Sequence, residues 1–269
     1  MAAGDLVVTD LDGTLWHHEE AIHPATADAF HQVIARGVPV LAATGCRRGS
    51  AARGLAGLGA RPPAVVLNGA LGVDLGTDER FQVHRFTTAD ALAVLEAFRA
   101  GGLDPCLYVD HPHHEVVVSA TPSTHRNHLD SLAGDVAEGR LDATAQDDAV
   151  LMFSLIGLPH GPLAAVADAV RDRAEVHLDR SFDVPGTAAI TVTPTGLSKW
   201  DGVRAWCAHV GMTPTRVIAL GDGPNDVELL ANADLALVPE VAHPAALRHA
   251  DRLVATPDDG GWASVLDHL

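Results

Sequence analysis

The sequence predicts an α/β protein with a Rossmann-like parallel-sheet core, helices on both faces of that sheet, and an inserted α+β cap domain. Short apolar runs of strand type alternate with helix-type segments at both ends of the chain, which is typical of a parallel sheet covered by helices. The alternation changes after Gly76 and resumes near Ala188, which indicates an insertion. With 269 residues, 47% of them hydrophobic, the chain is long enough for two moderate domains with buried cores.

The first part of the chain has the strand–helix rhythm of the core. LVVT (6–9) is short, apolar and β-branched, as buried strands are. Pro24 is well placed to begin the next helix, and Gly37 to end it. In this part we expect strands at 6–9, 38–44 and 64–70 and helices at 25–37 and 50–58.

The middle of the chain has a mixed pattern. The strands expected at 106–110 and 115–119 are antiparallel around a His/Pro turn. The segment 132–147 is polar and irregular, which favours loop and short helix. Further elements are expected as strands at 81–86 and 150–157 and as helices at 89–102 and 163–174. This set predicts an α/β cap domain at 84–186.

The alternating rhythm of the core returns in the last part of the chain. RVIALGD (216–222) is a clear buried strand that ends in Gly-Asp. Around it we expect strands at 188–194, 235–238 and 253–257 and helices at 199–211, 226–233, 243–250 and through Trp262. The predicted catalytic core is therefore discontinuous and consists of residues 1–83 and 187–269.

Composition limits the partners and the compartment. The 35 acidic residues exceed the 18 basic ones and give a formal net charge of -17, which disfavours nucleic acid and anionic membranes as partners. Three widely separated cysteines form neither a disulfide framework nor a zinc ligand set. Neither a secretory leader pattern nor a membrane-length apolar run is present. We expect a cytoplasmic protein, a monomer or small homo-oligomer, whose partner is a small molecule.

Polar residues follow the predicted core strands, at the sheet edge where ligands bind in parallel sheets. A lysine at the start of a helix, after a glycine, is a further candidate. The clusters are Asp10 and Asp12 after the first strand, Thr44 and Gly45 after the second, Asn68 and Gly69 after the third, Asp222, Asn225 and Asp226 after the strand at 216–221, and Lys199.

The acids at this edge favour a bound cation, although a solvated turn would also tolerate them. Two carboxylates two residues apart repel each other, and burial increases the cost. Mg²⁺ prefers oxygen ligands and leaves room for a phosphate, and Asp10 and Asp222 could supply such ligands. The Thr44 hydroxyl and nearby backbone N–H groups could hold phosphoryl oxygens.

The same residues suggest phosphoryl transfer. Asp10 could attack phosphorus and form an aspartyl-phosphate intermediate. Asp12 could protonate the leaving oxygen and then activate a water, a role that typically contributes about 10²–10⁴-fold in rate.

The chain resembles the haloacid dehalogenase-like hydrolase superfamily, in its Cof-type phosphatase branch with a large α/β cap. The resemblance is carried by DLDGT (10–14), ATG (43–45), GLSK (196–199) and GDGPND (221–226), in that order, together with NGA (68–70). It implies a Mg²⁺-dependent phosphatase that acts on a small phosphorylated metabolite, often a sugar phosphate.

The resemblance also implies roles for individual residues. Asp10 is the expected nucleophile, Asp12 the acid/base and Lys199 the catalytic cation. Mg²⁺ is expected at Asp10, the Asp12 backbone carbonyl and Asp222, with Asp226 supporting the metal site and orienting Lys199. The phosphate-binding set is Thr44, Gly45, Lys199 and Asn225, and the substrate-proximal set is Asn68, Gly69 and Arg47.

One position departs from the family pattern. The family often has arginine after ATG, whereas this chain has Cys46, followed by Arg47. Either Arg47 substitutes for the missing arginine or the affinity for substrate is altered. The histidine clusters at 17–23 and 111–114 are interpreted as a solvated flap and a hairpin turn rather than as metal sites.

Three other functions are compatible with this fold. They are phosphotransfer to a second substrate, as in a phosphomutase, non-catalytic binding of a phosphometabolite, and dehalogenation. Intact Asp10, Asp12, Lys199 and Asp222 argue against a binding protein. Asp12 and GDGPND argue against dehalogenation, because that reaction needs no second acid and no metal.

Overall fold

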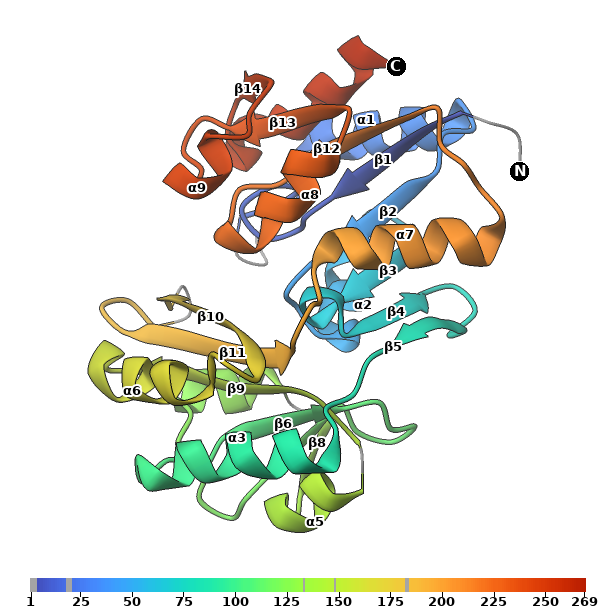
Figure 1. Cartoon of the computed structure of the whole chain (residues 1–269). Helices are drawn as coiled ribbons and strands as arrows, with labels where there is room; N and C mark the ends of the chain where they lie inside the picture. The colour runs from blue at the N-terminus through green and yellow to red at the C-terminus, as the bar shows by residue number, and fades with distance from the viewer. Residues whose placement is uncertain (1–3, 18–20, 133, 148, 182–183) are drawn as a thin grey trace. The chain divides into compact units, whose positions relative to one another are not determined.

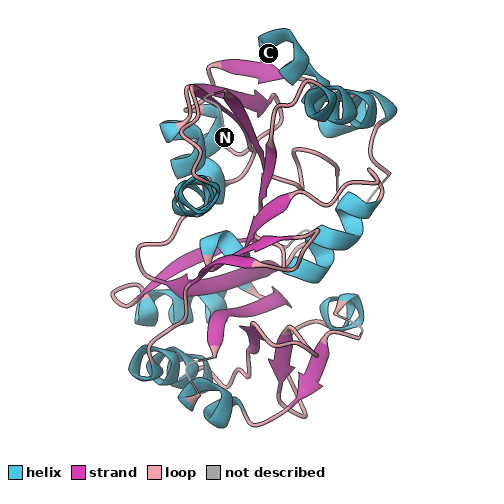
Figure 2. Ribbon diagram, turned by 90° about the vertical axis from the view of Figure 1, so that its right-hand side faces the viewer, coloured by secondary structure: helices cyan, strands magenta, loops and turns pink. Residues whose placement is uncertain are grey.

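The chain divides into two compact units in a computed structural model that describes residues 4–17, 21–132, 134–147, 149–181 and 184–269 (Figure 1). The core unit consists of Met1–Gln82 and Ser198–Leu269, and the inserted unit is Val83–Leu197. Each unit has its own sheet, drawn in magenta in Figure 2 with the helices in cyan.

The described residues of the core unit form an eight-stranded sheet with the order β14-β13-β12-β1-β2-β3-β4-β5. β1 pairs in parallel with both β12 and β2, so the two sequence segments of the core unit meet at this strand. β4 pairs antiparallel with β3 and begins an antiparallel extension of the parallel sheet. The strands are β1 (Asp5–Thr9), β2 (Val40–Ala43), β3 (Pro63–Val66), β4 (Leu71–Asp74), β5 (Arg80–Val83), β12 (Arg216–Leu220), β13 (Leu235–Pro239) and β14 (Arg252–Val254).

Helices cover both faces of this sheet, as the sequence predicts. Residues of α7 and α8 share one core cluster with alternate residues of the strands, such as Leu6 and Val8 of β1. On the other face Phe30 of α1 packs against Trp262, with ring centroids 5.5 Å apart. The helices are α1 (Pro24–Ala35), α2 (Arg48–Ala56), α7 (Lys199–Val210), α8 (Val227–Asn232) and α9 (Pro244–Leu247), with 3-10 helices η1 (Leu67–Gly69), η2 (Pro224–Asp226), η3 (Pro257–Asp259) and η4 (Gly261–His268).

Local sequence fixes the start of α7, which matters because its first residue is Lys199. Ser198 is the N-cap: its hydroxyl oxygen accepts the Asp201 N–H at 3.2 Å and its O–H donates to the Asp201 carboxylate at 2.7 Å. A serine cap with an acid three residues later satisfies N–H groups that have no partner within the helix. Gly211 ends the helix in the left-handed conformation, with φ 64°.

In its described residues the inserted unit forms a six-stranded sheet with the order β10-β11-β9-β6-β7-β8. Its pairs are antiparallel except β7 with β8. The elements are β6 (Cys106–Val109), β7 (Val116–Val118), β8 (Val136–Glu138), β9 (Val150–Leu158), β10 (Ala174–Arg180), β11 (Ala188–Pro194), α3 (Thr88–Ala100), α4 (Arg126–Ser131), α5 (Leu141–Gln146) and α6 (His160–Val170).

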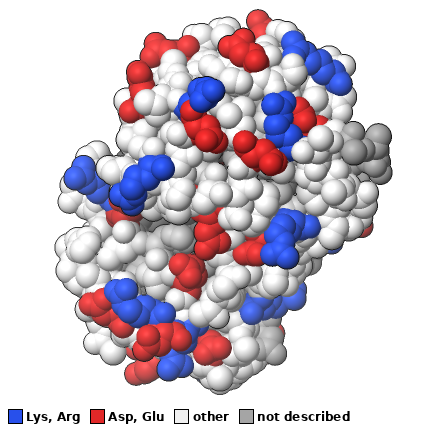
Figure 3. Space-filling view, turned by 45° about the horizontal axis from the view of Figure 1, so that its top comes forward, with Lys and Arg blue, Asp and Glu red and all other residues white. Residues whose placement is uncertain are grey.

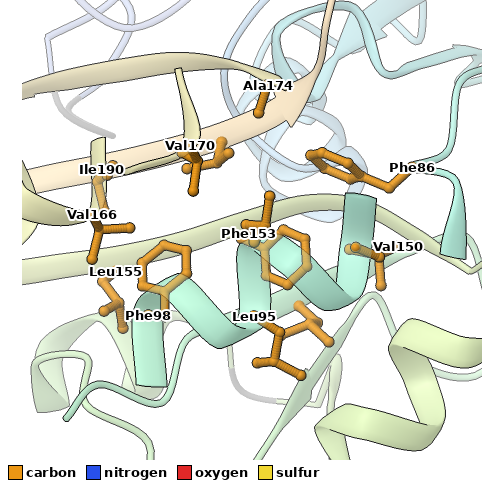
Figure 4. Close-up of a cluster of buried hydrophobic side chains, with 14 of the residues drawn as sticks. Phe86, Leu95, Phe98, Val150, Phe153, Leu155, Val166, Val170, Ala174 and Ile190 are labelled. Atoms are coloured by element: carbon orange, nitrogen blue, oxygen red, sulfur yellow. The ribbon is translucent and has the colours of Figure 1, made fainter. Parts of the chain in front are cut away.

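The inserted unit has a hydrophobic core of its own (Figure 4). Phe153 of β9 lies at its centre, edge-on to Phe86 with ring centroids 5.3 Å apart and stacked with Phe98 of α3 at 6.1 Å. Side chains of α5 and α6 and alternate residues of β11 complete the cluster. An insertion that buries this much apolar surface within itself is a separate packing unit.

The structure confirms the predicted fold class. The residues at which one unit ends and the other begins differ from the predicted ones. The strand at 188–194 was expected in the core sheet, but β11 pairs with β9 and β10, so the inserted unit continues to Leu197. Its alternating apolar residues, Ile190 and Val192, belong to the inserted core. Conversely, β5, which begins the expected strand at 81–86, lies at the edge of the core sheet. A strand joins whichever sheet buries its apolar face, and sequence alone does not specify that sheet.

The molecular surface carries both signs of charge. On the face shown in Figure 3, acidic and basic side chains are interspersed. Among the described residues, no helix combines the length and the apolar character needed to cross a membrane.

The contact of α7 with β3 yields a stability prediction. A Cβ atom at Gly202 would lie 2.3 Å from Val65 Cγ1, so Gly202→Ala should overpack the core and cost about 1–3 kcal/mol. For a chain of this size that is a fall of about 3–10 °C in the unfolding temperature, measured by circular dichroism. Gly161→Ala is the matched control, because a Cβ there meets nothing within 4 Å and should leave the temperature unchanged or slightly higher. Equal effects at both positions would contradict this packing.

Candidate active site

The parallel strands of the core unit bring the predicted polar clusters to one edge of the sheet. Asp10 follows β1 directly, and its N–H donates to the Leu220 carbonyl at the end of β12 at 2.9 Å. This pairing brings the segment around Asp10 close to Asp222 although the two residues are far apart in sequence. Thr44 follows β2 and donates its N–H to Val65 of β3 at 2.8 Å. The carboxyl ends of these strands therefore meet, as the fold requires of a ligand-binding edge.

Lys199 forms the buried centre of the site. Its Nζ atom donates to Asp10 Oδ1 and to Asp226 Oδ1, both at 2.6 Å, and Lys199 is only 1% exposed. Burial by itself would lower the pKa of Lys199, but the two adjacent carboxylates raise it, so the side chain is a permanent cation. The geometry brings together three residues that the sequence analysis proposed for one site.

Asp222 completes an acidic cluster with these two acids. Carboxylate oxygens of Asp10, Asp222 and Asp226 all lie within 4.8 Å of one another. Thr14 donates its hydroxyl proton to Asp222 Oδ1 at 2.8 Å. Burial raises the pKa of Asp222 to about 6, and burial also raises the pKa of Asp10, with Lys199 opposing that change. Burial of these two acids therefore disfavours their ionised form, and the charge of Asp226 adds to this effect.

The donor set fits a hard divalent cation. Three carboxylates face one ammonium group, which leaves two negative charges in excess. The cluster offers oxygen ligands only, which is the preference of Mg²⁺ and Ca²⁺ rather than of Zn²⁺. The orientation of the Asp226 carboxylate is fixed by the backbone, because its Oδ2 accepts the N–H groups of Asp222 at 3.0 Å and Gly223 at 2.9 Å.

Asp12 has an environment different from that of Asp10. Its carboxylate is outside the acidic cluster and accepts two hydrogen bonds, from Trp16 Nε1 to Oδ1 at 2.7 Å and from Cys46 Sγ to Oδ2 at 2.8 Å. Burial, with a further contribution from the Asp12 charge, raises the pKa of the Cys46 thiol well above its ordinary value, so the sulfur keeps its proton. Cys46 therefore contacts the second acid of the motif directly.

Two loops beside these acids are tied together. Leu67 and Asn68 donate their N–H groups to the carbonyls of Cys46 at 3.0 Å and Thr44 at 3.2 Å. Leu67 and Asn68 both have left-handed φ values, 53° and 54°, so the strand expected at 64–70 ends at Val66. For a leucine this conformation is strained and persists only where surrounding contacts impose it.

The amide pair Asn68 and Asn225 lies against Gly45. Asn225 Nδ2 donates to Asn68 Oδ1 at 2.9 Å, and a Cβ at Gly45 would lie 3.0 Å from that same oxygen. Gly69 faces α7, since a Cβ there would lie 2.5 Å from the Ser198 carbonyl oxygen. Arg47 is buried and is the N-cap residue of α2, and its substitution for the missing arginine stays a prediction.

Two further residues contact the site and are not among those predicted from the sequence. Thr14, the last residue of DLDGT, is 2% exposed and binds Asp222. Trp16 donates a hydrogen bond to Asp12. The signal in the sequence is a tryptophan four residues after an acid that follows a strand.

The structure describes the second of the two histidine clusters in full and the first only in part. Residues 18–20, within the cluster at 17–23, are outside the described residues. In the second cluster the rings of His111 and His114 stack with centroids 4.0 Å apart. Among the described residues the one group of three or more potential ligands is the acidic cluster around Lys199, which does not include these histidines.

The parallel sheet, with an acid–lysine cluster at the carboxyl ends of its strands, is the arrangement of an α/β enzyme. A comparison with protein families matches residues 7–266 to the haloacid dehalogenase-like hydrolases. The chain belongs to this family, as the motifs of the sequence predict.

Similar proteins were found among curated sequences and solved structures. The chain is 26% identical over 276 residues to the chloroplastic endoribonuclease YBEY of Arabidopsis thaliana, covering 97% of this chain but only 45% of that relative. It is 25% identical over 277 residues to a phosphoglycolate phosphatase of Methanopyrus kandleri, covering 98% of this chain and 96% of the relative. The solved structure of the HAD subclass IIB sugar phosphatase BT4131 has the same fold, with a TM-score of 0.80 at 19% identity and 98% of each chain covered.

Removal of the central cation should destabilise the core unit. Lys199→Met leaves Asp10 and Asp226 buried without their partner, and breaking such a pair costs about 3–5 kcal/mol. The loss should be smaller at pH 5 than at pH 7.5, because burial already raises the pKa of Asp10 and removal of Lys199 removes the charge that opposes this rise. Urea unfolding at both pH values measures it.

Arg204→Met is the matched control for that experiment. Arg204 lies in the same helix, and its ion pair with Asp201 is largely exposed, so its removal should change stability by less than about 1 kcal/mol. A Lys199→Met protein as stable as the control at pH 7.5 would contradict the central role of this lysine.

Proposed function

We propose that this protein is a Mg²⁺-dependent phosphatase that hydrolyses a small phosphorylated metabolite through an aspartyl-phosphate intermediate. The observation that carries the proposal is the different environment of the two acids in DLDGT. Asp10 lies beside a buried ammonium group and two further acids, whereas Asp12 lies between neutral donors. Two carboxylates with separate environments are suited to separate roles, as nucleophile and as acid/base.

In the first step one oxygen of Asp10 attacks phosphorus. Lys199 donates its hydrogen bond to Asp10 Oδ1, which leaves Oδ2 for the attack. The bond from phosphorus to the leaving oxygen breaks, and protonated Asp12 gives its proton to that oxygen. Lys199 stabilises the negative charge of the reacting groups without moving, because both of its acids already hold it.

In the second step the aspartyl phosphate is hydrolysed. Asp12, now ionised, takes a proton from a water molecule whose oxygen attacks phosphorus. The bond between phosphorus and Asp10 breaks, inorganic phosphate leaves, and the Asp10 carboxylate and protonated Asp12 are restored. Mg²⁺ held by Asp10, the Asp12 backbone carbonyl and Asp222, with Asp226 in support, would neutralise charge on the phosphoryl group.

The remaining predicted residues would bind the phosphoryl group and the rest of the substrate. Thr44 accepts the Cys46 N–H at 3.0 Å, and its hydroxyl group could donate its proton to a phosphoryl oxygen. Gly45 and Asn225 would bind phosphate nearby, and Asn68, Gly69 and Arg47 would lie close to the substrate.

The inserted unit would act as the cap that selects the substrate. Relatives named as a phosphoglycolate phosphatase and a sugar phosphatase support a small phosphomonoester as substrate. The net charge of -17 does not favour RNA as a substrate. A cytoplasmic location and a monomeric or small homo-oligomeric state stay predictions.

A phosphate-release assay tests the proposed reaction. With Mg²⁺ and a panel of phosphomonoesters that includes phosphoglycolate and sugar phosphates, the wild type should release phosphate, and EDTA should abolish the release. Asp10→Asn replaces the attacking carboxylate with an amide, which is a poor nucleophile, and should lower kcat by several orders of magnitude. The control is Asp28→Asn, an exposed aspartate of α1, which should retain full activity.

Other outcomes would exclude this function. Activity that survives EDTA would favour a reaction without metal. Activity retained in Asp10→Asn would exclude an aspartyl phosphate, and phosphate transferred to an added sugar phosphate rather than to water would indicate a phosphotransferase.

Metal binding should also appear as a pH-dependent gain in stability. Because the pKa of Asp222 is raised to about 6 when folded, the metal-free protein loses stability as pH rises from about 4 to above 6. Mg²⁺ binds ionised carboxylates, so a saturating concentration should raise the unfolding temperature by about 5–10 °C at pH 7.5. The rise should be much smaller at pH 5, and Asp222→Asn should abolish it. An equal rise at both pH values would contradict binding at this cluster.

A further inference from the structure

The Asp12 carboxylate is held at both of its oxygens by donors that come from different loops. Trp16 Nε1 binds Oδ1 at 2.7 Å and Cys46 Sγ binds Oδ2 at 2.8 Å. We infer that Trp16 and Cys46 are positioning residues that fix the orientation of Asp12 for proton transfer. This inference rests on the proposed function, in which Asp12 is the acid/base.

We call the two hydrogen bonds from Trp16 and Cys46 to the Asp12 carboxylate the Asp12 clamp. The Trp16 side of it is held in place by packing. Its side chain is 5% exposed, and its ring packs on α2 at Gly54, where a Cβ would lie 2.6 Å from Cη2. A glycine inside a helix costs about 1 kcal/mol relative to alanine, and here it makes room for the indole. The turn that contains Asp12 is also closed on Trp16, because the Gly13 N–H donates to the Trp16 carbonyl at 2.8 Å.

Cys46 is anchored on the other side by its backbone. Its N–H donates to Thr44 Oγ1 at 3.0 Å, and its carbonyl accepts the Leu67 N–H at 3.0 Å. Both partners belong to segments that follow core strands, β2 and β3. The sulfur atom therefore has a fixed position relative to the sheet, and it binds Asp12 Oδ2 from that position.

The Asp12 clamp would set the direction of proton transfer and would still leave acceptor positions on the carboxylate free for the reacting proton. Rotation of the carboxyl group about Cβ–Cγ would break both hydrogen bonds, so one orientation is favoured. A carboxylate has about four acceptor sites, and two donors leave the others for the reacting proton. Since a small misplacement of a catalytic group can cost about 10²-fold in rate, orientation by two residues outside the acidic cluster has catalytic value.

The test compares substrates that differ in their need for a general acid. Glycerol phosphate has a poor leaving group that must be protonated, whereas 4-nitrophenyl phosphate has a good one. Trp16→Phe and Cys46→Ala should lower kcat/KM for glycerol phosphate about 10-fold or more, and for 4-nitrophenyl phosphate by less than about 3-fold. Cys46→Ser keeps a donor at this position and should restore most of the lost activity.

Matched variants separate positioning from loss of folding. Cys207→Ala and Trp200→Phe change the same residue types in α7, neither of which makes the Asp12 hydrogen bonds, and both variants should behave as wild type toward both substrates. Unfolding temperatures of all variants identify any general destabilisation. Equal losses toward both substrates, or no rescue by Cys46→Ser, would overturn the inference.

Crystal structures of the Trp16 and Cys46 variants test the inference without any measurement of enzyme activity. In Trp16→Phe and Cys46→Ala the Asp12 carboxylate should rotate or occupy two orientations, and in Cys46→Ser it should keep one. An Asp12 side chain unchanged in both deletion variants would overturn the clamp even if the enzyme is active. If the wild type hydrolysed no phosphomonoester, the proposed function would fail, while this comparison would still report on the clamp.

Discussion

The arrangement of the site depends on one buried ammonium group between two carboxylates. Lys199 begins α7, Asp10 follows β1, and Asp226 follows β12, so this ion triad joins three segments that are distant in sequence. A buried lysine is costly unless it is paired, and two acids within hydrogen-bond distance keep it charged. The pairing does not balance the charges, because Asp222 adds a third carboxylate to the same cluster. The excess negative charge is the physical reason for expecting a cation there.

Close packing around the carboxylates explains why glycines recur in the motifs. A Cβ at Gly13, where φ is 87°, would lie 2.4 Å from Asp222 Oδ2. A Cβ at Gly221 would lie 2.6 Å from Asp226 Cγ. Both glycines let the backbone approach a carboxylate more closely than any other residue would allow. The acids of the cluster are thereby fixed by backbone as well as by Lys199.

The two acids of DLDGT are two residues apart and yet have separate environments. Asp10 faces the charged cluster, and Asp12 faces an indole N–H and a thiol. The separation arises because the chain turns immediately after β1, with Thr14 directed to Asp222 and Trp16 to Asp12. One short turn thus contacts both the acidic cluster and Asp12, which suits the proposed reaction, in which a nucleophile and a proton donor would act on the same phosphoryl group.

The sequence by itself determined the fold class, the family and the acid and lysine positions, because these depend on local patterns: apolar runs, caps and motifs with fixed spacing. The tertiary structure decided which sheet takes β11, since that choice depends on which core buries Ile190 and Val192. It also decided the surroundings of Asp12, because the Cys46 thiol and the Trp16 indole reach it from separate loops. The sequence left Cys46 as an unexplained departure from the family pattern. Its contact with Asp12 depends on the pairing of β1 with β2, which spacing along the chain does not reveal.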